Sequence, residues 1–472
     1  MRKDHGFWDD HEMEGLVHRF EEQLNTGNSF FFDVDDFALI IDYYLEATNV
    51  KLAEVSLNHA IDLHPQAVIF KVKQAQLLAI TNHAQRALAL LNSIESLEPY
   101  NADIIRTKAN IFSHLEQYDA AIEEYKKLTI EDDAEDIYSN IAFEYENKEQ
   151  FSRAIHYLKL VLEINPYNEN ALYEIAFCYE SQGNIKESIQ YFNAYVQENP
   201  LSSIGWFNLG VAYAAVDQNE HAIEAFDFAI ALEPDYPSAY FNKASVLCNQ
   251  EKYELAIEEY KSTLKLEAPE AFTLHYIGEC YEKMGALEKA AEHYHKAVDI
   301  NENISDAWAG LASVFYQQGE YIKAIPFIDK AIHSDTKNPD YLMAKGDIAR
   351  QAEQYEMAMD AYSKALDLDL EDIDCWLDLA EVTALNSEHL ADGITVLREA
   401  LAFFPDHATI LYRLSFYLFT NEQTKEGFQV LQEALHINFS QYKEFLELDD
   451  SLPENPLIID LIEQVKHIKQ NS

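Results

Sequence analysis

The chain has 472 residues and a formal net charge of −49, because 83 Asp and Glu residues outnumber 34 Lys and Arg residues. This balance argues against a nucleic-acid ligand, since phosphate binding depends on Lys and Arg, and against docking on an anionic membrane surface. Hydrophobic residues make up 48 % of the chain, which is enough to bury a substantial core. The acidic residues are spread along the chain, which favours a role in solubility but also allows a basic partner.

The amino terminus and the cysteines favour a cytoplasmic location. Met1 to His5 lead into acidic residues and not into the apolar core of a signal peptide, and no apolar stretch is long enough to cross a bilayer. Four cysteines are scattered without a Cys-x-x-Cys pair: Cys178, Cys248, Cys280 and Cys375. We therefore expect reduced thiols, with no disulfide framework and no zinc site.

Residues 1–33 precede the repeating part of the chain and are expected to cap it. The segment from Glu12 to Leu24 is typical of an amphipathic helix, with Leu16, Val17 and Phe20 on its apolar side. A terminal unit of a stacked array has one open face that needs a cover. The alternative is that this segment contacts a partner or a second copy of the chain.

A pattern with a period of 34 residues extends over residues 34–441. Its clearest copy reads Trp206-x-x-Leu209-Gly210-x-x-Tyr213, then Ala222-x-x-x-Phe226, then Pro234. Spacings of three and four place these side chains on one face of each of two helices, and the proline ends the second helix. The pattern predicts twelve units: 34–67, 68–101, 102–134, 135–168, 169–202, 203–236, 237–270, 271–304, 305–338, 339–372, 373–407 and 408–441.

Glycine and tryptophan follow the same register. The fifteenth position, where one helix must turn into the next, holds Gly183, Gly285 and Gly319. Glycine adopts the left-handed conformation of such a turn without strain. The eighth position, which predicts a tight contact between helices, holds Gly210, Gly278 and Gly346, and the fourth holds Trp206, Trp308 and Trp376.

Residues 442–472 follow the last unit. After Pro453 and Pro456 they contain an apolar pattern from Leu457 to Ile468, which predicts one more helix. We expect this helix to cap the twelfth unit, with binding to a partner or to a second chain as the alternative.

On these motifs the chain resembles the tetratricopeptide repeat proteins over roughly residues 34–441. The resemblance implies an all-α fold, namely a right-handed superhelical solenoid of about twelve helix-turn-helix repeats with terminal capping helices. The family serves as an adaptor in many unrelated processes, so the resemblance implies a fold and leaves the partner open.

In this family the first helix of each unit lines a concave groove. The resemblance implies groove-facing aromatic residues at the fifth and ninth positions of the central units: Phe143, Tyr173, Phe177, Phe207 and Phe241. The sixth position of three units holds asparagine: Asn140, Asn208 and Asn242. Aromatic rings offer large contact areas and carboxamides pair with a peptide backbone, so we expect a bound peptide with apolar anchors. The alternative is that the rings pack on neighbouring units and the asparagines bond within the fold.

One well-known ligand of the family is disfavoured. Members that hold the acidic carboxyl terminus of chaperones use Lys, Arg and Asn on consecutive units. Here Arg106 and Asn110 have no basic neighbours in the next unit, where Ser139 and Phe143 stand instead.

Sequence motifs for catalysis are absent. The chain has no phosphate loop, no dinucleotide fingerprint, no His-Glu-x-x-His and no Gly-x-Ser-x-Gly. We therefore expect no catalytic residues, no metal and no cofactor. The leading prediction is a non-enzymatic scaffold that binds a protein or peptide, with a basic character or apolar anchors, in the groove. The competing predictions are an array that self-assembles through its terminal helices and an enzyme whose site is built on the array.

Overall fold

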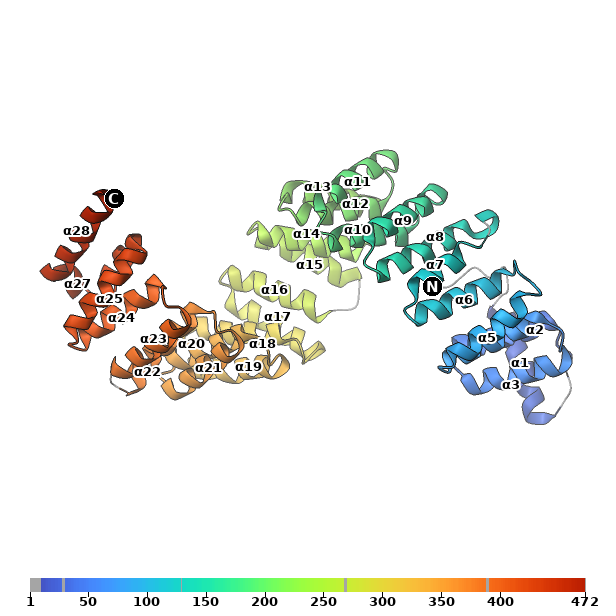
Figure 1. Cartoon of the computed structure of the whole chain (residues 1–472), viewed down its shortest axis with the longest axis horizontal. Coiled ribbons are helices and arrows are strands. Elements are labelled where there is room, and N and C mark those ends of the chain that lie inside the picture. The colour runs from blue at the N-terminus through green and yellow to red at the C-terminus, as the bar shows by residue number, and fades with distance from the viewer. Residues whose placement is uncertain (1–9, 28–29, 129, 267–269, 388–389, 472) are drawn as a thin grey trace. The chain divides into compact units, whose positions relative to one another are not determined.

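The computed structural model describes residues 10–27, 30–128, 130–266, 270–387 and 390–471, and within these ranges it contains helices and no strand (Figure 1). Parts of the predicted amino-terminal segment, residues 1–9 and 28–29, lie outside the described residues. The chain divides into two compact units, one ending at Pro234 and the other beginning at Asp235.

The first unit contains thirteen described helices. They are α1 (Asp10–Thr26), α2 (Val34–Glu46), α3 (Val50–Leu63), α4 (Val68–Ile80), α5 (Ala84–Glu95), α6 (Ala102–His114), α7 (Tyr118–Tyr125), α8 (Ile130–Asn147), α9 (Phe151–Ile164), α10 (Glu169–Ser181), α11 (Ile185–Glu198), α12 (Ser203–Ala214) and α13 (Asn219–Leu232). Asp133 interrupts α8 with non-helical backbone angles.

The described part of the second unit continues the numbering. Its helices are α14 (Pro237–Asn249), α15 (Tyr253–Leu266), α16 (Ala271–Lys283), α17 (Leu287–Ile300), α18 (Ser305–Gln317), α19 (Tyr321–Ser334), α20 (Pro339–Gln351), α21 (Tyr355–Leu368), α22 (Ile373–Ser387), α23 (Leu390–Phe403), α24 (Ala408–Thr420), α25 (Thr424–Ile437), the 3₁₀ turn η1 (Phe439–Gln441), α26 (Tyr442–Leu446), α27 (Ser451–Glu454) and α28 (Pro456–Asn471).

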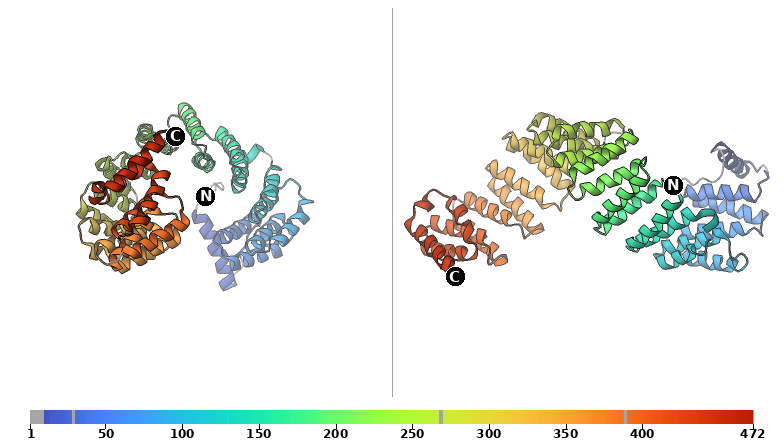
Figure 2. Two further views of the ribbon diagram at one scale, coloured as in Figure 1. Left: turned by 60° about the vertical axis from the view of Figure 1, so that its left-hand side comes forward. Right: turned by 90° about the horizontal axis from the view of Figure 1, so that it is seen from above.

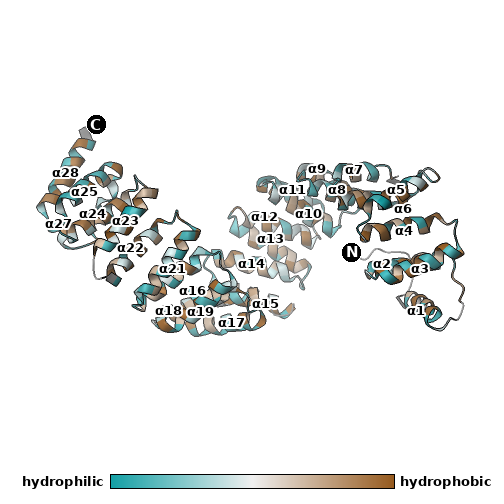
Figure 3. Cartoon of the chain, turned by 60° about the horizontal axis from the view of Figure 1, so that its bottom comes forward, coloured by the Kyte–Doolittle hydropathy of each residue, from teal (hydrophilic) through white to brown (hydrophobic). Residues whose placement is uncertain are grey.

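Within each unit, helices that follow one another in sequence pack as pairs, and each pair packs on the next (Figure 2). Apolar and polar residues alternate around most helices, so that one side of each helix can be buried (Figure 3). The prediction of an all-α array of helix pairs with additional terminal helices is therefore confirmed. The boundaries 1–33, 34–441 and 442–472 stay a prediction.

In the pairs whose connecting turn is described, that turn contains a left-handed residue, as the glycines predict. Gly183, Gly285 and Gly319 have φ angles of 67°, 73° and 75°. Non-glycine residues adopt the same conformation in the equivalent turns: Thr48, Asn82, Glu116, Glu149, Asp217, Glu251, Glu353 and Glu422. The geometry of the repeat imposes the left-handed residue even where the side chain disfavours it.

Tyr294 of α17 shows how a small residue allows close packing. A Cβ atom on Gly278 of α16 would lie 2.7 Å from the Tyr294 ring, and one on Gly310 of α18 would lie 2.5 Å from it. The ring is therefore held between glycines of two consecutive helix pairs. Its hydroxyl donates a hydrogen bond to Oε2 of Glu282 at 2.7 Å.

The tryptophans at the fourth position share one role. In each case the indole Nε1 donates a hydrogen bond to the backbone carbonyl six residues earlier: Trp206 to Pro200 at 3.0 Å, Trp308 to Glu302 at 2.8 Å and Trp376 to Leu370 at 3.1 Å. Each bond ties the loop before a first helix to that helix.

The terminal helices cover the pairs next to them. On α1, Phe20 is fully buried with Phe37 of α2, the two ring centroids being 6.1 Å apart. On α28, Ile458, Ile462 and Val465 pack in one cluster with residues of α25. Each terminal helix thus removes apolar surface from water that the neighbouring pair would otherwise expose.

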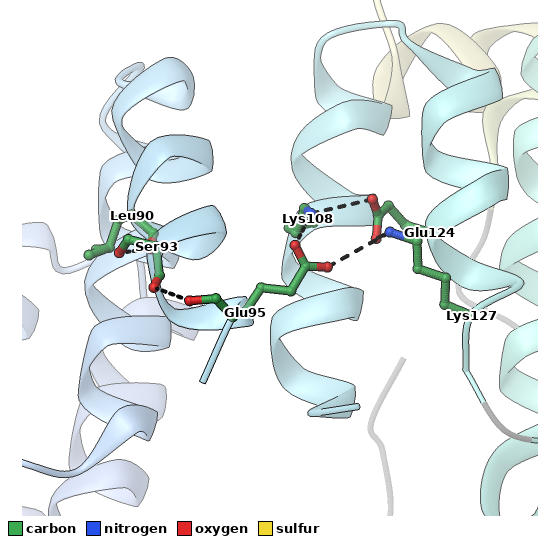
Figure 4. A network of polar contacts seen from close by, with 7 residues as sticks. Leu90, Ser93, Glu95, Lys108, Glu124 and Lys127 are labelled. Atoms are coloured by element: carbon green, nitrogen blue, oxygen red, sulfur yellow. Dashed lines mark hydrogen bonds and ion pairs between the residues drawn. The ribbon is translucent and has the colours of Figure 1, made fainter. Parts of the chain in front are cut away.

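A buried lysine joins helices of the second and third pairs of the first unit (Figure 4). Lys108 of α6 is 5 % exposed, and its Nζ lies 3.0 Å from Oε2 of Glu95 and 3.4 Å from Oε1 of Glu124. Lys127 in turn contacts Oε2 of Glu124 at 2.8 Å. Two carboxylates thus compensate the buried ammonium group.

Candidate functional site

Three of the predicted groove residues form an exposed aromatic surface in the first unit. Phe143 on α8 is 54 % exposed, and Tyr173 and Phe177 on α10 are 40 % and 51 % exposed. Phe177 also meets the edge of Phe151 with a ring-centroid distance of 6.1 Å. These three large side chains, on the first helices of two consecutive pairs, remain accessible to solvent.

Two predicted residues on α12 are buried instead. Phe207 packs on Tyr173 at a centroid distance of 6.2 Å and on Phe226 at 5.9 Å. Asn208 is 3 % exposed and donates a hydrogen bond from Nδ2 to the backbone carbonyl of Leu172 at 3.4 Å. Both therefore match the alternative of packing within the fold, and they offer little surface to a partner. Asn140 on α8 is half-buried.

The predicted residues of the second unit line a cavity. Phe241 and Asn242 of α14 face a space of about 480 Å³ together with Phe272 and Tyr276 of α16. Phe241 meets Tyr276 edge to face at 5.6 Å. The Nδ2 atom of Asn242 donates to the carbonyl of Ser238 at 2.9 Å, so one donor of this carboxamide is already used.

A second cavity lies where no site residue was predicted. It has a volume of about 670 Å³ and is lined by α2, α4 and α6, with Asp42, Gln76, Asn110 and His114 among its residues. The first three stand at the ninth position of consecutive units and His114 stands at the thirteenth. These positions carry polar side chains in place of aromatic ones, so the aromatic pattern that predicts the other site residues does not include them.

Two carboxyl groups meet between α8 and α10, the helices that carry these exposed rings. Glu146 of α8 is hydrogen-bonded to Glu174 of α10, and Cys178 donates from Sγ to Oε1 of Glu146 at 3.7 Å. Burial, followed by the charge of Glu174 and by the hydrogen bond to it, raises the pKa of Glu146 to about 7. Burial also raises the pKa of Glu174. None of the described lysines and arginines forms an ion pair with either group.

This pair predicts a pH-dependent stability. The pKa of Glu146 is about 7 in the fold, above the ordinary value of 4.5, so the unfolded chain loses this proton first and stability falls as the pH rises from 4.5 to 7. Glu146→Gln retains a hydrogen-bond donor and removes the titration. We expect this variant to gain on the order of 2 kcal/mol in free energy of unfolding at pH 8 and almost nothing at pH 4.5.

Urea unfolding followed by circular dichroism across this pH range measures the difference between the two proteins. Glu180→Gln changes an exposed residue of α10, the helix that carries Glu174, and is the control that should not change the pH dependence. If the free energy of unfolding changed with pH in the same way for Glu146→Gln and for the unaltered chain, the raised pKa of Glu146 would be contradicted.

Arg106 and Asn110 are committed to other contacts. Arg106 pairs with Asp133, and Oδ1 of Asn110 accepts a hydrogen bond from the Tyr125 hydroxyl at 2.7 Å. Neither side chain is arranged as part of a basic clamp.

The described residues contain neither a metal-binding cluster nor a helix that could span a membrane. No three His, Cys, Asp or Glu side chains within those residues are grouped so as to hold a metal ion. None of the helices that the structure describes combines the length and the apolar character needed to span a bilayer.

Three protein-family models match parts of the chain. Two are described as tetratricopeptide repeat, one matching residues 148–206 and 281–348 and the other residues 207–271. The third is described as anaphase-promoting complex, cyclosome, subunit 3, and matches residues 317–400.

Three curated proteins are similar to shorter stretches. The chain is 24 % identical to BBSome complex member BBS4 of Bos taurus over 160 residues, which is 34 % of this chain and 31 % of that protein. It is 26 % identical to anaphase-promoting complex subunit 3 of Schizosaccharomyces pombe over 127 residues (27 % and 19 %). It is 30 % identical to general transcription factor 3C polypeptide 3 of Homo sapiens over 88 residues (19 % and 10 %). The chain therefore spans less than a third of each relative.

Two solved structures are similar to this chain. A chain of the APC/C hetero-tetramer Cut9-Hcn1 is 17 % identical, with a TM-score of 0.41 over 87 % of this chain and 94 % of that chain. The C-terminal part of a TPR repeat-containing protein from Cytophaga hutchinsonii is 21 % identical, with a TM-score of 0.44 over 54 % and 98 %.

Proposed function

The chain belongs to the tetratricopeptide repeat proteins, and from this premise we propose that it is a non-enzymatic scaffold that binds a peptide or protein along the first helices of its units. Proteins of this family are generally non-enzymatic. Two of the similar proteins are named as members of multiprotein complexes, the BBSome and the anaphase-promoting complex. A role in protein–protein interaction is consistent with both points.

The exposed aromatic surface of Phe143, Tyr173 and Phe177 is the observation that carries the proposal. These rings lie on α8 and α10, the first helices of consecutive pairs, and the same two helices carry the carboxyl pair Glu146–Glu174. Rings of this size provide apolar contact, and the carboxyl pair attracts positive charge. The expected ligand is therefore a segment that carries an apolar anchor and a nearby Lys or Arg.

The other predicted residues take secondary places in this proposal. Phe207 and Asn208 hold Tyr173 and the backbone of α10 in position, since they are buried against them. Phe241 and Asn242 line a separate contact region at the cavity of the second unit. Asn140, half-buried on α8, is proposed at the edge of the aromatic surface.

Selection from a displayed peptide library with the full chain as bait tests the proposal. We expect enrichment of peptides that combine an aromatic or aliphatic residue with Lys or Arg. Phe143→Ala and Phe177→Ala should each weaken a selected peptide about tenfold or more, because truncating an interface anchor costs more than 1 kcal/mol.

Tyr167→Ala is the matched control, because Tyr167 is equally exposed at 55 % but lies in the loop between α9 and α10. This variant should bind like the unaltered chain. Unchanged binding by the two phenylalanine variants, with their helical content intact, would remove the groove from the proposal.

Self-association through the terminal helices is the second candidate function. It is favoured by Leu457 and Ile468 of α28, which remain exposed although the opposite side of the helix is buried. Light scattering over a concentration series separates the two functions, because a mass that rises with concentration and falls back in Leu457→Ser would favour self-association. The cytoplasmic location stays a prediction.

A further inference from the structure

Two cysteines that are 32 residues apart in sequence meet in the second unit. Cys248 lies on α14 and Cys280 on α16, and their Sγ atoms are 3.0 Å apart. Cys280 is 1 % exposed, whereas Cys248 is only partly buried. Both are free thiols. The other two cysteines, Cys178 on α10 and Cys375 on α22, are each buried without a cysteine neighbour among the described residues.

The surroundings distinguish the two sulfur atoms. A hydrogen bond from Cys280, and a further one from Tyr260 of α15, lower the pKa of Cys248 despite its burial and the nearby Glu279. The same pairing, together with burial, raises the pKa of Cys280. The more accessible sulfur is thus also the one that ionises more readily, and the thiolate is the reactive form.

We propose that Cys248 and Cys280 form an oxidation site that takes an uncharged hydroperoxide and yields a reversible disulfide between two consecutive helix pairs. The Cys248 sulfur attacks the terminal peroxide oxygen, the O–O bond breaks, and an alcohol or water leaves with a proton. Cys280 then attacks the resulting sulfenic sulfur, the S–S bond forms, and water leaves. Two thiols lose two electrons in total, and the peroxide gains them.

Distance and charge both support this chemistry. A disulfide requires a sulfur–sulfur distance of about 2.05 Å, so the two atoms need to approach by only about 1 Å. The formal charge of −49 repels anionic oxidants such as glutathione disulfide, and an uncharged peroxide meets no such barrier. The sequence alone predicts reduced thiols because the four cysteines are scattered without a Cys-x-x-Cys pair. Cys248 and Cys280 stand at the twelfth and the tenth positions of adjacent units.

A disulfide between Cys248 and Cys280 would link two helices that line the cavity of the second unit. The helices that carry the two cysteines, α14 and α16, also supply Phe241 and Tyr276 to the cavity of about 480 Å³. A covalent link between them would restrict their relative movement and so the width of this cavity. The oxidation site itself does not depend on any ligand bound there.

Mass spectrometry of the full chain tests the proposal directly. The reduced protein is treated with hydrogen peroxide, then unfolded in denaturant, alkylated, and digested without reductant. We expect a mass loss of about 2 Da from the unalkylated protein, a cross-linked peptide that contains Cys248 and Cys280, and alkylation of Cys178 and Cys375 alone. Dithiothreitol should restore alkylation at all four sites.

Variants separate this site from general oxidation. Cys280→Ser should abolish the cross-link and leave Cys248 to oxidise further to the sulfinic acid, whereas Cys375→Ser should retain the cross-link. Oxidation of Cys248 in the unaltered chain while Cys280 stays alkylated would overturn the proposal. So would a disulfide that links two separate chains.

Discussion

Replacing Tyr294 by alanine is expected to lower the free energy of unfolding by about 3–5 kcal/mol, the range for deleting a large buried ring. The ring is 1 % exposed and lies between Gly278 and Gly310. Alanine at position 294 would leave a cavity that faces both glycines, and neither glycine has a side chain that could fill it. The loss should therefore reach both interfaces of α17, with α16 and with α18.

Chemical denaturation followed by circular dichroism measures this loss, and hydrogen exchange locates it. Because a repeat array need not unfold in one step, exchange should accelerate first in residues 271–317. Tyr294→Phe is the matched control: it retains the ring, loses the bond to Glu282 and should cost about 1 kcal/mol. A similar loss in both variants would show that the hydroxyl, and not the ring, stabilises this contact.

Removing the buried ammonium group of Lys108 is expected to cost about 3 kcal/mol, near the lower end of the range for breaking a buried ion pair. In Lys108→Ala the buried Glu124 carboxylate loses the buried ammonium group that lies 3.4 Å away. The loss stays at the lower end because Lys127 still contacts Glu124 at 2.8 Å. Denaturant unfolding of the first unit's helices, monitored by hydrogen exchange in α5 to α7, measures the effect.

A second substitution distinguishes lost charge pairing from lost packing. In Lys108→Met combined with Glu124→Leu, no unpaired charge remains in the interior, and most of the stability should return. Lys126→Ala is the control, since it breaks only the exposed pair with Glu123 and should cost less than about 0.5 kcal/mol. A double variant as unstable as Lys108→Ala would contradict the electrostatic explanation.

The positions of helices and turns could be predicted because the repeat pattern is set by residues that are close together in the sequence. Trp206, Gly210 and Phe226 recur at fixed spacings, and each unit packs mainly on the units next to it. Predicting the left-handed turn at Gly183 and Gly285 needed only the observation that glycine fills that position repeatedly. In such an array short-range order in the sequence corresponds to short-range contact in space.

The site was predicted less completely, and the differences in exposure between its residues have a common physical origin. Phe143 and Phe207 both stand at positions predicted to face the groove, yet one is 54 % exposed and the other 8 %. The difference depends on the neighbouring side chains: Tyr173 and Phe226 pack on Phe207, while among the described residues no ring is recorded against Phe143. Repeat position alone carries no information about that neighbour's size.

Periodic apolar residues alone were sufficient to determine an all-helical array and its turns, because these follow from contacts over a few residues. Only the tertiary structure decided which faces stay open, that Glu146 lies beside Glu174, and that Cys248 lies beside Cys280. Those outcomes depend on the separation of side chains from successive units at a scale of a few ångströms. A pattern of residue types does not encode that separation.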